Sequence, residues 1–242
     1  MSLFRGKIIA VLALILVVSS STLVFKVEAA SPSCKSFNRS DFTNPTGITN
    51  KYFPLKPGTT FIYTGTKEGS SQRDVFSITH KTKTIQGVIT VEIRDTVKLN
   101  GTLAELTFDW FAQDRFGNVW YFGEFATEYD NGVPVSHEGS WQAGVNGARP
   151  GIVMEAQPRI GDFYCQEVAP GVAQDQAKVL SLDKERCVPK GCFDDALLTK
   201  ESSPLIPGVV ENKYYAPGIG LIEALKVQGG SESIKLVQIL HQ

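Results

Sequence analysis

The chain of 242 residues lacks the signatures of most enzymes and of nucleic-acid-binding proteins. It has three histidines and no Gly-x-Ser-x-Gly, His-Glu-x-x-His, phosphate-loop or dinucleotide motif. Its 24 basic and 25 acidic residues leave a net charge of −1, so no basic stripe exists for phosphates or for anionic lipid. The sequence therefore predicts no nucleic-acid partner and no cofactor.

Cysteines are few and show no metal-binding pattern. The four are Cys34, Cys165, Cys187 and Cys192; with no Cys-x-x-Cys and only scattered histidines, no metal site is predicted. An even number favours two disulfides if the chain is exported, and sequence alone leaves three connectivities. Among these we favour Cys187 with Cys192, which closes the turn at residues 188–191, and Cys34 with Cys165.

Long apolar runs are absent except near the N-terminus. Arg5 and Lys7 precede an apolar run at residues 8–18, and Val27 and Ala29 place small side chains at the −3 and −1 positions of a cut after Ala29. This pattern predicts a signal peptide at residues 1–29 and a secreted or extracytoplasmic protein. An uncleaved anchor stays open as an alternative, because residues 23–25 lengthen the apolar run towards the roughly 20 residues that span a bilayer. Membrane contact is expected only through this segment.

Beyond the signal segment, the periodicity is that of β-strands. Residues 88–99 alternate apolar and polar side chains, and Asn100-Gly101 supplies the residues of a tight hairpin turn. We predict one all-β domain at residues 59–242, a strongly curved antiparallel sheet or open barrel, after an extended arm at residues 30–58. Further strands are expected at residues 103–113, 119–124, 162–168, 177–182, 193–199, 209–215, 219–227 and 233–240.

Three carboxylates lie on strand faces that are otherwise apolar. Asp95 is at even spacing from Val91 and Ile93, which places it on the same strand face. Glu124 is likewise at even spacing from Trp120, and Glu223 occupies an apolar position of an alternating run. A charge on a buried face is costly unless it is paired, hydrogen-bonded or open to a wet cavity. We therefore expect these carboxylates to line one internal cleft, although each could instead reach water at a rim or pair with an arginine.

Tryptophans in such a cleft would suit a glycan. Trp110, Trp120 and Trp141 lie close to the carboxylates in sequence, although packing is the commoner role of tryptophan. If the protein is an enzyme, two carboxyl groups would act as a hydrolytic pair. The catalytic candidates are then Asp95, Asp109, Glu124 and Glu223.

Four segments resemble an uncharacterised family of exported bacterial and archaeal proteins. These are residues 52–60 (YFPLKPGTT), 109–124 (DWFAQDRFGNVWYFGE), 139–154 (GSWQAGVNGARPGIVM) and 214–221 (YYAPGIGL). The resemblance implies export and brings no activity with it. The last segment is also similar to a strand of curved-sheet envelope proteins that hold apolar ligands.

The sequence thus favours a non-enzymatic extracytoplasmic domain that binds a small apolar or glycan ligand, or an envelope protein partner. A carboxylate-dependent hydrolase and a structural envelope protein without a ligand are the alternatives. The candidate ligand-binding residues are Asp95, Trp110, Trp120, Glu124, Trp141 and Glu223.

Overall fold

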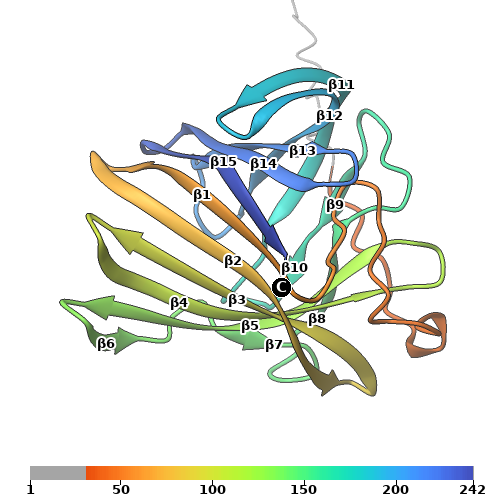
Figure 1. Ribbon diagram of the computed structural model, residues 1–242. Coiled ribbons are helices and arrows are strands. Elements are labelled where there is room, and N and C mark those ends of the chain that lie inside the picture. Colours follow the sequence, from red (N-terminus) through yellow and green to blue (C-terminus); the bar gives the residue numbers. More distant parts are fainter. Residues whose placement is uncertain (1–30, 242) are drawn as a thin grey trace, which may run out of the picture. The chain divides into compact units, whose positions relative to one another are not determined.

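The computed structural model describes residues 31–241, so the predicted signal peptide lies outside the described residues. In this part of the chain a single antiparallel sheet contains fifteen strands (Figure 1). The elements are η1 (Arg39–Asp41), β1 (Thr59–Lys67), β2 (Ser70–Ile85), β3 (Val88–Leu99), β4 (Thr102–Gln113), β5 (Val119–Asp130), β6 (Val133–Ser136), β7 (Trp141–Gln142), β8 (Arg149–Met154), β9 (Phe163–Cys165), β10 (Glu167–Val168), β11 (Gln176–Val188), β12 (Gly191–Ser202), β13 (Val210–Ala216), β14 (Gly220–Gln228) and β15 (Glu232–His241).

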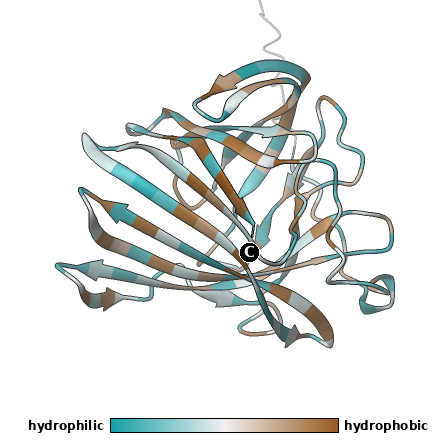
Figure 2. Cartoon of the chain, viewed as in Figure 1, coloured by the Kyte–Doolittle hydropathy of each residue, from teal (hydrophilic) through white to brown (hydrophobic). Residues whose placement is uncertain are grey.

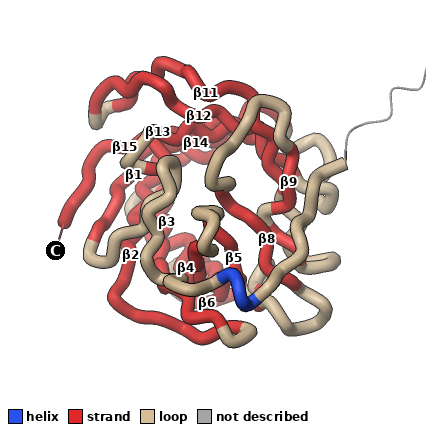
Figure 3. Tube along the Cα trace, turned by 90° about the vertical axis from the view of Figure 1, so that its right-hand side faces the viewer, coloured by secondary structure: helices blue, strands red, loops and turns tan. Residues whose placement is uncertain are grey.

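The sheet curves until it is nearly closed. Its order is β10-β8-β5-β4-β3-β2-β1-β15-β14-β13-β12-β11-β9, with β6 and β7 added beside β5. The two end strands, β10 and β9, are separated in the chain by Gln166 alone. Figure 3 shows the strands as a ring with loop segments across its opening. The predicted all-β, strongly curved antiparallel fold is confirmed.

The strand and turn predicted most sharply from the sequence are both found. β3 has the predicted bounds, and Val91 and Ile93 are almost fully buried on one of its faces. Asn100 and Gly101 have φ angles of 49° and 85°, as a tight hairpin turn with two positive φ values requires. Apolar and polar segments alternate along the strands in Figure 2. Because side chains alternate along each strand, successive residues lie on the inner and the outer face of the sheet in turn.

Part of the arm predicted at residues 30–58 packs into the barrel. Ile48 and Leu55 form a β-bridge with each other, and both are buried together with Tyr52. The side-chain Oε1 of Gln113 accepts hydrogen bonds at 2.9 Å from the backbone N–H groups of Thr49 and Asn50. Residues 48–55 thus form a plug held by β4.

Two disulfides complete the framework in the connectivity favoured from the sequence. Cys34 is bonded to Cys165 in β9, and Cys187 is bonded to Cys192 across the β11–β12 hairpin. The first ties the N-terminal arm to the sheet across 131 residues of sequence. Among residues 31–241 the structure has no helix long and apolar enough to cross a membrane.

Candidate functional site

The barrel contains a cavity of about 400 Å³ with an aromatic region. Phe61 and Phe76 are opposite one another on β1 and β2, with ring centroids 6.5 Å apart. Phe53 of the plug lies 5.5 Å from Phe111 and 6.4 Å from Tyr215, measured between ring centroids. These side chains line the cavity and offer a surface for an apolar group.

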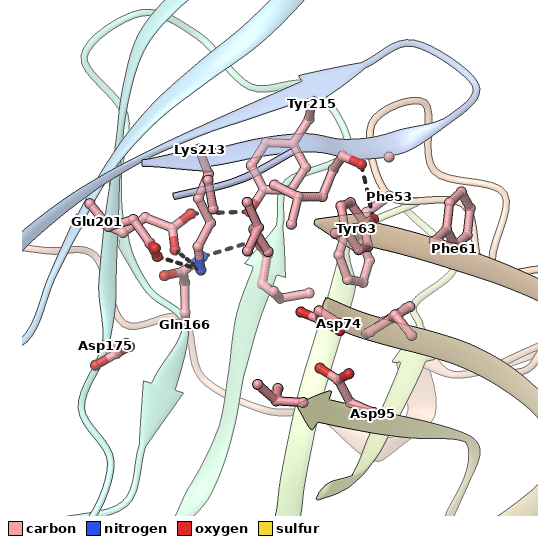
Figure 4. A pocket seen from close by; sticks show the side chains of 18 of the residues that line it. Phe53, Phe61, Tyr63, Asp74, Asp95, Gln166, Asp175, Glu201, Lys213 and Tyr215 are labelled. Atoms are coloured by element: carbon pink, nitrogen blue, oxygen red, sulfur yellow. Dashed lines mark hydrogen bonds and ion pairs between the residues drawn. The ribbon is translucent and has the colours of Figure 1, made fainter. Parts of the chain in front are cut away.

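One wall of the cavity carries unpaired carboxyl groups. Asp74 pairs in register with Val97, and Asp95 with Phe76, so both acids lie on the inner face of β2 and β3. They are within hydrogen-bonding reach of each other, and both point into the cavity in Figure 4. Among the described residues no basic nitrogen lies within 4.0 Å of either carboxyl. Burial, together with Asp95, raises the pKa of Asp74 well above its ordinary value, and burial raises the pKa of Asp95.

Another part of the wall has its charges paired. The Lys213 Nζ lies 2.7 Å from Glu201 and 3.3 Å from Glu211, and Tyr215 donates a hydrogen bond of 3.1 Å to Glu201 (Figure 4). Burial by itself would lower the pKa of Lys213, but the two glutamates raise it well above its ordinary value. Lys213 is therefore a charged partner of Glu201 and Glu211.

A second acidic cluster lies behind Tyr121. The Tyr121 hydroxyl is 2.5 Å from Asp109 Oδ1 and 3.0 Å from Glu124 Oε2. Burial, reinforced by Asp95, raises the pKa of Asp109 to about 8. Burial, reinforced by Asp109, raises the pKa of Glu124 to about 8. At neutral pH both carboxyls are mainly protonated and act as hydrogen-bonding groups.

The structure brings together only part of the predicted cleft. Asp95 lines the cavity, and Asp109 and Glu124 lie in the wall behind Tyr121. Glu223 does not join them: it is 1% exposed, forms an ion pair with Arg186, and lies 3.6 Å from Lys235. Glu223 is thus paired with an arginine, which is one of the alternatives that the sequence allows.

A β-bulge explains the different position of Glu223. In the pairing of β13 with β14, Tyr214 is opposite Glu223 but Tyr215 is opposite Leu221, so one residue of β14 is unmatched. The extra residue reverses the alternation of faces. As a result Leu221 and Ala224, three residues apart, both line the cavity, whereas Glu223 does not.

The three tryptophans pack elsewhere in the domain. Trp110 lies under the Lys83 ammonium, 3.4 Å from Nζ to a ring centroid. Trp120 donates a 2.8 Å hydrogen bond to Asp114, and Trp141 packs edge-on against Tyr121 at 5.4 Å between centroids. The cavity lining formed by the described residues includes none of the three tryptophans.

Sequence reasoning missed several lining residues. Gln72 and Asp74 precede Phe76 at even spacing in β2, which is the pattern of a shared face. The signal is weak because the alternate positions Ser71 and Arg73 are also polar, so neither face of this segment reads as buried. Lys213 lies within a similarly polar run.

Comparison with known proteins adds little. No protein-family model matches the chain, and no curated protein matches it significantly. A protein assigned as exported, with a YmcC-like fold, from Bacteroides fragilis has a TM-score of 0.46 at 12% identity. A protein assigned as a lipoprotein, from Parabacteroides distasonis, has a TM-score of 0.43 at the same identity. Each similarity covers 79% of this chain and 99% of the other.

Likenesses this low support no inference about ligand or activity. The chain's own features are more informative: disulfides form and persist in oxidising compartments, and this domain contains two. They indicate an extracytoplasmic domain.

Proposed function

We propose that this domain is a non-enzymatic binding protein whose ligand is a small, largely apolar molecule with one polar end. The observation that carries the proposal is the cavity of about 400 Å³, with aromatic side chains and unpaired carboxyl groups on its walls. Small-molecule sites are usually concave and mostly apolar with a few polar groups, and occupy ~300–1,000 Å³. The cavity fits that description in size, and its aromatic side chains supply the apolar part of the lining, although acids make the lining more polar than that of most such sites.

The two alternatives fit the geometry less well. A purely structural protein would fill its interior with side chains. A glycoside hydrolase of the retaining type needs an ionised nucleophile beside its acid. Asp109 and Glu124 share the Tyr121 hydroxyl, but both have a pKa of about 8 and neither lines the cavity. Neither is therefore suited to act as the nucleophile at neutral pH.

Titration with N-phenyl-1-naphthylamine, an uncharged apolar dye that fluoresces in apolar surroundings, tests the proposal. We expect a saturable rise in fluorescence with the wild type. Val97→Phe places a ring in the cavity and should abolish the signal. The matched control is Ile89→Phe on the same strand, where the side chain is 48% exposed, and it should bind the dye normally.

Two results would count against the proposal. Absence of saturable dye binding by the folded wild type would show that the cavity is not a site for apolar ligands. If the protein released nitrophenol from nitrophenyl glycosides and Asp109→Asn lost this activity, the protein would be a hydrolase and not a non-enzymatic binding protein.

A further inference from the structure

The unpaired acceptors of the cavity wall are its most unusual feature. Asp74 is 8% exposed and Gln72 is 6% exposed, and both lie on the inner face of β2. Gln72 Oε1 accepts no hydrogen bond from the described residues, and Asp74 Oδ1 and Asp95 Oδ1 have no donor there apart from the proton that the two carboxyls can share. A buried acceptor without a donor is energetically unfavourable, because it has lost its hydrogen bonds to water and gained none in return. A ligand that supplied donors here would remove this cost.

The charge of the cavity indicates which kind of donor is suited to it. Its lining contains eight carboxylic side chains and two lysines. Both lysines are engaged: Lys213 with Glu201 and Glu211, and Lys67 with Glu232 at 3.7 Å. The excess of acids in a concave space that is partly lined by aromatic side chains favours a positive ligand over a neutral or negative one.

An ammonium group matches these acceptors better than other common polar groups. It offers three N–H donors and a positive charge, whereas an alcohol offers one donor and a carboxylate none. Hydrogen bonds between charged partners are also roughly twice as strong as neutral ones. The aromatic side chains Phe61, Phe76 and Phe111 would contact the apolar remainder of the same molecule.

We infer that the cavity recognises cationic amphiphiles, with a primary ammonium group held by Asp74 and Asp95 and an apolar chain against the aromatic side chains. This inference deepens the proposed function and rests on it. Burial disfavours two adjacent carboxylates, so the empty pair retains a proton, and an arriving ammonium would supply the missing positive charge.

Competition against the bound dye tests this inference. Octylamine, octanol and octanoate share one apolar chain and differ in charge and in donor number. For the wild type we expect octylamine to displace N-phenyl-1-naphthylamine at a concentration about tenfold lower than octanol requires. A tenfold difference in affinity corresponds to about one charge-assisted hydrogen bond. Octanoate should be the weakest competitor.

The carboxyl pair is tested by Asp74→Asn/Asp95→Asn, which keeps the side-chain shape and removes the charge. Whatever the variant's own affinity for the dye, octylamine and octanol should displace the dye at similar concentrations, so that the preference for octylamine is lost. Asp194→Asn, at an exposed position of β12, is the matched control and should retain the preference. Should the double variant not fold, Asp95→Asn alone, at the half-buried member of the pair, gives the same comparison.

The outcomes separate the two claims. Absence of dye binding by the wild type would overturn the proposed function itself. Dye binding with equal displacement by octanol and octylamine would overturn only the ammonium inference. A preference for octylamine that persists without Asp74 and Asp95 would also overturn it, because the recognising group would lie elsewhere.

Discussion

At the scale of single residues, Asp109 is unusual because it is an acid buried beside other acids. It is 8% exposed, and Tyr121 is its hydrogen-bond donor. Its pKa of about 8 lies well above that of the unfolded chain, near 3.8. Between these values the unfolded chain ionises first, so the stability that Asp109 contributes is full below about pH 4 and is lost as pH rises to about 8.

We predict that Asp109→Asn is neutral or mildly destabilising at about pH 5 and stabilising relative to the wild type at about pH 9. Asparagine retains an acceptor for Tyr121 and carries no charge. Between these conditions the difference in free energy of unfolding should change by up to about 1.4 kcal/mol per pH unit. Urea denaturation at both pH values measures it, with the exposed Asp194→Asn as control. Equal destabilisation at both pH values would contradict a protonated Asp109.

At the scale of elements, a β-bulge in β5 positions the acidic cluster. Asp109 is opposite Glu124 while Phe111 is opposite Tyr121, so β5 contains one extra residue between these pairs. Gly123 within the bulge has a φ of 132°, and a Cβ there would lie 2.3 Å from the Trp141 carbonyl oxygen. Glycine is therefore required for the bulge that turns Glu124 towards Tyr121.

Gly123→Ala should destabilise the domain by more than about 2 kcal/mol, because it combines an unfavourable φ with a backbone clash. Gly101→Ala is the matched control: its φ is 85° but nothing lies within 4 Å of the added Cβ, so only about 1 kcal/mol should be lost. Thermal unfolding of the two variants measures the difference. Similar losses would show that the contact with Trp141 is unimportant.

At the scale of the whole molecule, the two disulfides constrain very different lengths of chain. Cys34–Cys165 spans 131 residues of sequence, whereas Cys187–Cys192 spans 5. Closing a longer loop removes more entropy from the unfolded chain. The long-range bond also fixes the arm that carries the plug of the cavity.

We therefore predict that Cys34→Ala/Cys165→Ala costs about 5 kcal/mol and Cys187→Ala/Cys192→Ala about 2 kcal/mol by loop entropy. Denaturant unfolding of both double variants provides the comparison, and the hairpin variant is the control for the chemistry of the change. The dye-binding signal should survive in the hairpin variant. A larger loss from the hairpin variant would contradict this order.

Local features of the sequence determined much of the fold. Alternating side chains predicted β3 at its observed bounds, and Asn100-Gly101 predicted the hairpin that follows. These features could be predicted because strand alternation and positive φ are properties of neighbouring residues. The favoured cysteine pairing likewise agrees with the structure.

Only the tertiary structure decided which acids share the cavity. One unmatched residue in β14 separates Glu223 from Asp95, and Arg186, 37 residues away in sequence, neutralises it. Asp74, which only a weak sequence pattern marks, takes the place beside Asp95 because β2 pairs with β3 in that register. Bulges and strand register depend on contacts between distant segments, and the periodicity of one strand does not contain them.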